Sequence, residues 1–336
     1  MSRYAKAALF GCIIGLVGVV ASLLPVVDEC DQAVGLYALF TLRGHRPAPP
    51  ETVIISMDRE SAQRFDIQRD PVKWPRAAHA ELLDVLKTGG ARFVAFDILF
   101  DEHRDPGDDE KFAAAIRKAG NVILCGCTLS EHILLHGTDR KVDGTVMIET
   151  FLPPIPSLAT AALATASFPL PRMPARIDQC WSFKLGNTPT LPVVALQMYG
   201  MDVYDVFASA IRKTNGDGRL PRDRESLLDQ GRAQQAVRAI RDEFQQYPAL
   251  ERVVLDSMSS RPDIAGDPKK ANLVHSLLEM YAGDESRFIN YYGPARTITT
   301  IPYFKVIETL GEGLDFRGKA VFVGISEDFR AEQVGG

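Results

Sequence analysis

The sequence predicts an α/β protein with a mostly parallel central sheet flanked by helices, with an N-terminal transmembrane helix and a helical insertion. Three observations predict this fold. β-branched runs alternate with amphipathic helical segments between residues 52 and 127, which is the pattern of parallel strands joined by crossover helices. An uncharged segment opens the chain, and a long charged helical block later interrupts the α/β pattern.

Length and charge narrow the possible functions. With 336 residues and a net charge of −5, the chain is large enough for one big domain or two small ones. It has no basic run interleaved with aromatic residues, so nucleic acid is not a predicted partner.

The N-terminal segment from Ala7 to Val27 is uncharged and follows Arg3 and Lys6. As a helix, about 21 residues at 1.5 Å each span roughly the 30 Å of a bilayer core, which predicts a transmembrane helix over 7–27. A cleaved signal peptide is the alternative, although its apolar region has only about 7–15 residues. Basic residues before the span and acidic residues after it predict a cytoplasmic N-terminus, residues 1–6. The protein is therefore expected in the inner membrane as a single-pass chain, with its bulk periplasmic or extracellular.

Residues 28–51 form a predicted juxtamembrane helix and linker. The stretch from Ala33 to Leu42 is apolar but too short to cross a membrane, so it is expected either at the membrane surface or as a core helix. The proline-rich residues 46–51 mark the start of the folded domain.

The first part of the α/β domain covers residues 52–201. Thr52 to Met57 has the composition of a strand buried on both faces. Residues 75–87 place leucines at helical spacing and end at Gly89, as expected of a helix C-terminus. Further elements are expected in this order: a strand over 91–96, a helix over 108–119 and a strand over 121–127.

Residues 202–285 are dominated by charged helical segments, of which 222–247 and 267–283 are the clearest. This block is the predicted helical insertion. The α/β pattern resumes over 286–326 with a helix at 301–311 and a last strand at 319–326, and residues 327–336 form a tail. Because the first strand follows the anchor and the last strand precedes the tail, we expect both ends to leave neighbouring parts of one sheet.

Four of the five cysteines are expected to face an oxidising space. Cys125 and Cys127 lie two apart in a predicted strand and point to one face, which hinders a bond between them. We expect a disulfide from one of them to Cys180, Cys127–Cys180 in particular. Free buried thiols are the alternative.

Seven segments, taken in order, resemble a CHASE2 domain. They cover about residues 35–200 and 286–326, and the order of all seven behind an apolar segment carries the resemblance more than any one of them. The segments are "YALFTLRG", "VIISMDRES", "WPRAAHAELLDVLKTGGARFVAFDILF", "DPGDDEKFAAAIRKAGNVIL", "FINYYGP", "TITTIPYFKVIE" and "LDFRGKAVFVGIS".

The resemblance implies the extracytoplasmic, non-catalytic sensory domain of a bacterial transmembrane cyclase or kinase, with an output module beyond Gly336. Such a domain couples binding of a ligand or partner to the membrane. Two features depart from the family: residues 202–285 have no counterpart that we can place, and the chain stops before the expected returning membrane helices. An envelope scaffold that assembles through the α/β domain and the insertion is therefore the alternative function. Expected partners are the lipid bilayer and either a second copy or another envelope protein.

Asp58, Trp74, Arg76 and Asp97 form the predicted ligand site. Asp58 and Asp97 each end a predicted strand, and open α/β sheets bind ligands at the carboxyl ends of their strands. Trp74 and Arg76 lie between them in the sequence. The alternative without a ligand is that these carboxylates accept loop amides and pair with Arg76.

An acidic cluster at the start of the helix at 108–119 has a structural interpretation. Asp105, Asp108, Asp109 and Glu110 crowd a helix start, where carboxylates accept free backbone amides and complement the helix dipole. Their spacing is not that of a calcium loop.

The sequence predicts no metal, no cofactor and no catalysis in this region. Cys125, Cys127, His132 and His136 are metal-ligand types, with both histidines on one face if that stretch is helical, but C-x-C is not the usual zinc spacing. The motifs G-x-S-x-G, H-E-x-x-H, the P-loop and G-x-G-x-x-G do not occur. A metal-assisted hydrolase using Asp58, Asp97 and Asp101 is the enzymatic alternative.

Overall fold

The structure is a computed structural model of the chain. It describes residues 10–16, 18–19, 25–67, 70–136, 142–170, 177–184, 186–215, 220–221, 223–228 and 232–326. The chain forms two compact units: a smaller one of Met1–Ala48 with Asn290–Thr297, and a larger one of Pro49–Ile289 with Ile298–Gly336.

A mostly parallel sheet forms the centre of the larger unit, as predicted. Its order is β10-β1-β11-β2-β3-β4, with β5 also paired to β3, and every pair except β3 with β4 is parallel. The strands are β1 (Thr52–Met57), β2 (Phe93–Leu99), β3 (Val122–His136), β4 (Val142–Leu152), β5 (Ala164–Ser167), β10 (Thr300–Pro302) and β11 (Ala320–Ile325).

The crossover helices cover one face of this sheet. The connections from β1 to β2, β2 to β3 and β10 to β11 all run in the same direction along the sheet, so right-handed crossovers place their helices on the same face. One apolar core joins those helices to the strands, for example Leu83 and Phe112 to Val94 and Phe96. The helices are α3 (Arg59–Arg64), α4 (Arg76–Thr88), α5 (Pro106–Ala119), α6 (Pro156–Ala161) and α14 (Tyr303–Glu308), and the 3-10 turn η1 (Pro71–Lys73) lies between α3 and α4.

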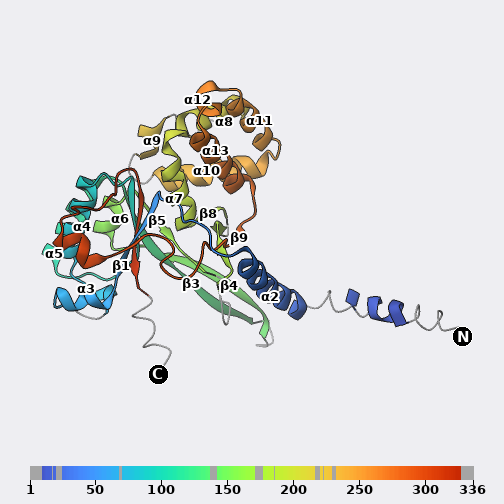
Figure 1. The fold of residues 1–336 in the computed structure, drawn as a ribbon, viewed down its shortest axis with the longest axis horizontal. Helices are drawn as coiled ribbons and strands as arrows, with labels where there is room; N and C mark the ends of the chain where they lie inside the picture. Colours follow the sequence, from blue (N-terminus) through green and yellow to red (C-terminus); the bar gives the residue numbers. More distant parts are fainter. Residues whose placement is uncertain are drawn as a thin grey trace, which may run out of the picture. The chain divides into compact units, whose positions relative to one another are not determined.

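The opposite face is covered by helices from residues 191–282. A second apolar core joins Phe93, Ala95 and Ile123 of the sheet to Phe207 and Tyr281 of these helices. Figure 1 shows α3–α5 and α8–α13 on opposite sides of the strands. The helices are α7 (Leu191–Tyr199), η2 (Gly200–Asp202), α8 (Tyr204–Asn215), α9 (Arg224–Leu228), α10 (Arg232–Gln246), α11 (Leu250–Ser259), α12 (Pro262–Ala265) and α13 (Pro268–Ala282).

Several predicted boundaries need correction. The single helix expected over 222–247 is two helices, α9 and α10. The third strand does not end at Cys127 but continues to His136, so the stretch with His132 and His136 is extended and not helical. Small two-stranded pairs, β6 (Gln179–Trp181) with β9 (Ser286–Phe288) and β7 (Phe183–Lys184) with β8 (Thr188–Pro189), complete the larger unit.

The long strand β3 continues past the parallel sheet as one half of a hairpin. From Cys127 to His136 it pairs antiparallel with β4 alone, and in Figure 1 the two strands run on as a ribbon beyond the other strands. The ribbon begins next to Gly126. A Cβ atom at this position would lie 2.4 Å from the ring of Phe151. Only glycine leaves room for that ring.

The smaller unit contains α2 (Pro25–Arg43) and residues 290–297. The rings of Phe40 and Tyr291 meet edge to face, with centroids 5.9 Å apart. The Arg43 guanidinium donates to the Asn290 side chain and to the Tyr291 carbonyl. These contacts hold α2 to the segment that joins β9 to β10 in the chain.

None of the helices within the described ranges combines the length and the apolar character that a bilayer crossing requires. The predicted transmembrane helix over 7–27 is therefore not found. Residues 10–16 and 18–19 are helical, whereas residues 7–9, 17 and 20–24 of that segment lie outside the described ranges.

Candidate functional site

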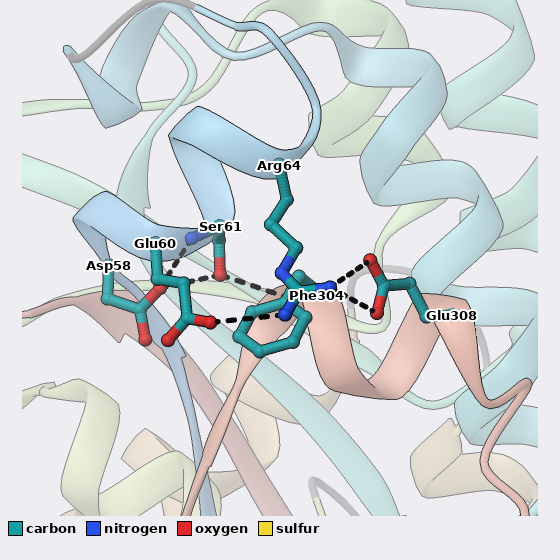
Figure 2. Close-up of polar contacts among 6 residues, drawn as sticks. All are labelled: Asp58, Glu60, Ser61, Arg64, Phe304 and Glu308. Atoms are coloured by element: carbon teal, nitrogen blue, oxygen red, sulfur yellow. Dashed lines mark hydrogen bonds and ion pairs between the residues drawn. The ribbon is translucent and has the colours of Figure 1, made fainter.

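Asp58 follows β1 and caps the next helix. Its carboxylate accepts from the Ser61 amide at 2.8 Å and from the Ser61 hydroxyl at 2.6 Å. The Ser61 oxygen in turn accepts from the Phe304 amide at 3.1 Å, at the start of α14 (Figure 2). Asp58 therefore acts here as a helix cap, and the bonds it begins reach a segment more than 240 residues away in sequence.

Arg64 adds a second contact between α3 and α14. Its guanidinium lies 3.3 Å from both carboxylate oxygens of Glu308, 3.4 Å from Glu60 and 4.5 Å from the Phe304 ring centroid (Figure 2). These side chains are about half exposed, so the ion pairs contribute at most about 1 kcal/mol each. They orient α14 on α3 more than they stabilise the fold.

Trp74 is part of the core, not the wall of an open pocket. Its ring meets the Tyr303 ring edge to face, with centroids 5.2 Å apart. The Tyr303 hydroxyl lies 3.1 Å from Nδ1 of His79. Trp74, Tyr303 and His79 are all buried, so this aromatic cluster holds the start of α14 against α4.

His79 is neutral in this setting. It lies among the rings of Phe96, Phe100 and Phe112. Burial, helped by the nearby positive charge of Arg76, lowers the pKa of His79 to about 3. An uncharged imidazole thus faces the tyrosine hydroxyl, whose own pKa burial raises well above its usual value.

Arg76 pairs with Asp109 in the interior. The side chains are 3% and 8% exposed, and Arg76 also donates to the Glu102 carbonyl. The Asp109 carboxylate accepts from the Arg104 amide at 3.1 Å. Burial lowers the pKa of Arg76, and the charge and hydrogen bond of Asp109 oppose that shift. This ion pair joins the start of α4 to the start of α5.

The acidic cluster thus divides into distinct roles. Asp105 caps α5 by accepting from the amides of Gly107 and Asp108. Asp108 lies in the first turn and Glu110 pairs with Arg117. The helix-start interpretation is confirmed, and the ion pair of Asp109 is what sequence reasoning missed.

Asp97 stands apart from the other three predicted residues. Side chains alternate between the two faces along β2. Phe93 and Ala95 belong to the core on the face opposite Trp74. Asp97, two residues after Ala95, lies on that same face and is exposed. Its neighbour is Cys125, whose pKa is raised to about 12 by burial, with the Asp97 charge adding to the shift. The structure therefore brings Asp58 and Trp74 to the start of α14, directs Arg76 to Asp109 of α5, and places Asp97 on the other side of the sheet.

The predicted disulfide is not formed in the structure. Cys127 in β3 and Cys180 in β6 are both free, and so is Cys125. The residues that the structure describes contain no group of three or more His, Cys, Asp or Glu side chains arranged to hold a metal ion. The side chains of His132 and His136 lie outside the described residues.

We name the connected set of Asp58, Ser61, Trp74, His79 and Tyr303 the α14 cluster. Tyr303 and Ser61 were not among the predicted site residues. The spacing of Asp58 and Ser61 is that of a helix cap and its third residue, a signal present in the sequence. Nothing local points to Tyr303, because its partners lie more than 220 residues earlier.

The α14 cluster joins the two ends of the larger unit. β1 lies between β10 and β11, with a full parallel register from Thr52 opposite Ala320 to Met57 opposite Ile325. The first and last strands are therefore neighbours in one sheet, as expected. Because they are parallel, however, the chain enters β1 and leaves β11 at opposite edges of the sheet, so the expectation that both ends leave neighbouring parts of it is confirmed only for the strands themselves. The cluster connects the residues that leave β1 to the helix that leads into β11.

The family model of the CHASE2 domain matches residues 13–333. No curated protein and no solved structure matches the chain. The match covers nearly the whole length and includes the helices of 191–282. The chain belongs to the CHASE2 family of sensory domains.

Proposed function

We propose that this chain is the extracytoplasmic sensory domain of a bacterial signalling protein, held in the inner membrane by residues 7–27. A ligand or partner shifts signalling by binding two arrangements of the domain with different affinity. The domain itself carries out no chemistry. It passes a change in shape to the membrane through its first and last strands.

One observation carries this proposal. β1 and β11 are adjacent strands, and the Ser61 oxygen ties the exit of β1 to the amide that begins α14. A rearrangement that moves α14 relative to α3 would therefore shift β11 against β1, the two strands that come next to the chain ends in sequence. Family membership supports the sensory role.

The location is supported by the uncharged segment 7–27, with basic residues before it and acidic residues after it. Protease added to intact spheroplasts tests it. The expected result is digestion of the bulk of the chain with a cytoplasmic marker protein left intact. Full protection that ends only after permeabilisation would contradict the proposed orientation.

Anchoring is tested separately by extraction of the membranes at alkaline pH. The full chain is expected to stay in the pellet, and a variant without residues 1–27 is expected to leave it. Release of the full chain with the mature N-terminus near Ser22 would favour a cleaved signal peptide.

A further inference from the structure

We propose that the hairpin of β3 and β4 is a dimerisation arm that packs against the same arm of a second copy of this chain. The arm is defined as residues 127–136 with 142–152, and the inference rests on the proposed membrane anchoring. Four exposed large apolar side chains gather on it: Leu129, Val146, Met147 and Ile148.

The strand register places three of these side chains on one face. Ile148 lies directly opposite Glu131, and Leu129 is two residues before Glu131, so both project from the same side. Val146 is two residues before Ile148 and shares that side. We call this the outer face; its Leu129, Val146 and Ile148 are 46%, 43% and 45% exposed.

The opposite face of the arm differs. There Glu149 pairs with Lys184 at 2.9 Å, with both side chains largely buried, and the Phe151 ring lies across Gly126. Those contacts fasten that face to the body of the larger unit. Met147, 48% exposed, belongs to the same face further along β4. The outer face has no comparable contact among the described residues.

The edges of the arm are unprotected as well. Beyond Gly126, β3 pairs only with β4, and β4 pairs only with β3, so each strand has one edge without a strand partner among the described residues. Natural sheets protect such edges with proline, lysine or short strands. The two strands of the arm contain no proline, lysine or arginine. A long apolar ribbon of this kind is typical of an interaction surface.

The area of the outer face indicates which partner it fits. Ten residues at about 3.3 Å each and a width of about 10 Å give roughly 300 Å² per copy, or about 600 Å² buried by two. Stable free complexes bury about 1,200–2,000 Å², so a freely diffusing partner would be held only weakly. Another copy tethered in the same membrane has a high effective concentration and needs no more area than this.

The composition of the face also suits a twofold contact. Glu131 is its one charged residue among those described on that face. The apolar side chains of one copy can therefore pack on those of the other without a pattern of opposite charges. A face that meets its own copy about a twofold axis must be self-complementary in this way.

Energy transfer between donor- and acceptor-labelled full chains in proteoliposomes tests the arm. Ile148→Glu and Leu129→Glu are expected to weaken association at least tenfold. Met147→Glu is the matched control, because this neighbour has the same exposure on the opposite face. Energy transfer unchanged in both outer-face variants, or lost equally in Met147→Glu, would overturn the proposal. Circular dichroism of each variant confirms that it is folded.

Flotation of the same vesicles separates this inference from the proposed anchoring. If the wild-type chain does not float with lipid, anchoring fails, and sedimentation equilibrium at high protein concentration then tests the arm. A dimer that Ile148→Glu abolishes and Met147→Glu retains supports the arm, and a monomer throughout overturns it. Flotation lost in Ile148→Glu and retained in Met147→Glu would identify lipid as the occupant and overturn the second copy.

Discussion

The buried ion pair between Arg76 and Asp109 gives the sharpest test of how the N-terminus of α4 is held to the N-terminus of α5. Arg76→Met leaves the Asp109 carboxylate, 8% exposed, with only the Arg104 amide and the outlying His103 ring as partners. Leaving one buried charge without its partner costs about 3–5 kcal/mol in the free energy of unfolding. Asp109→Leu leaves the Arg76 guanidinium without its partner in the same way, and we expect a similar loss in the free energy of unfolding.

The double variant Arg76→Met with Asp109→Leu distinguishes this reasoning from simple loss of packing. It removes both charges together, and only the bonds to the Glu102 carbonyl and the Arg104 amide are lost, at about 1 kcal/mol each. We therefore expect the double variant to be more stable than either single variant. The assay is urea unfolding in mild detergent, followed by tryptophan fluorescence, with unchanged slopes as the check on the two-state analysis.

An exposed ion pair between the same two helices provides the control. Lys118 lies 2.6 Å from Asp84, and the two side chains are 63% and 51% exposed. Asp84→Asn is expected to cost no more than about 1 kcal/mol, because solvent screens an exposed pair. If the losses in the free energy of unfolding of Arg76→Met and Asp109→Leu simply add in the double variant, the interpretation as a coupled, buried ion pair is refuted.

Three further predictions concern the clusters described above. Ser61→Ala leaves the amide that begins α14 without its acceptor, so we expect a loss of about 1–3 kcal/mol and faster amide exchange in α14, whereas Ser276→Ala, a half-exposed helical serine, changes stability by less than about 0.5 kcal/mol. Cys125, with its pKa raised to about 12, is expected to react with iodoacetamide at pH 8 at least a hundredfold more slowly than Cys127, as read by peptide mass spectrometry, because only the thiolate reacts; equal rates would contradict the burial. The pKa of His79 falls from 6.5 unfolded to about 3 folded, so the unfolded state binds more protons between these values, and stability is lost as pH falls through that window by up to about 1.4 kcal/mol per unit. In His79→Gln that part of the slope disappears, and an unchanged pH profile would count against a buried neutral imidazole.

The order of the strands and helices was predictable because each element carries a local signal. Thr52 to Met57 is a strand with the bounds its β-branched run predicts. The helix α5 begins at the acidic cluster, where the Asp105 carboxylate accepts from the amides of the first turn. Such interactions join residues a few positions apart, and their spacing is visible in the chain itself.

The partners of the predicted site residues were not visible in the same way. The interpretation without a ligand paired Arg76 with Asp58 or Asp97, yet Arg76 pairs with Asp109, because α4 and α5 lie side by side on one face of the sheet. Asp97 lies near the end of β2, which β11 separates from β1, and it points to the other face, since side chains alternate along β2. A shift of one residue in that alternation changes which residues share a pocket.

The sequence by itself determined the class of fold, the parallel order of the early strands and the family, because these follow from hydrophobic period, turn residues and the succession of motifs. Only the tertiary structure decided that β10 and β11 enclose β1, that Tyr303 packs on Trp74 and His79, and that residues 191–282 form the second layer over the sheet. The physical reason is that the crossovers from β1 to β2, β2 to β3 and β10 to β11 run one way and fill one face. The other face is buried by the helices of the long connection from β5 back to β10, which crosses the sheet in the opposite direction. Burial of that face is a property of the whole assembly of elements, and no short stretch of residues encodes it.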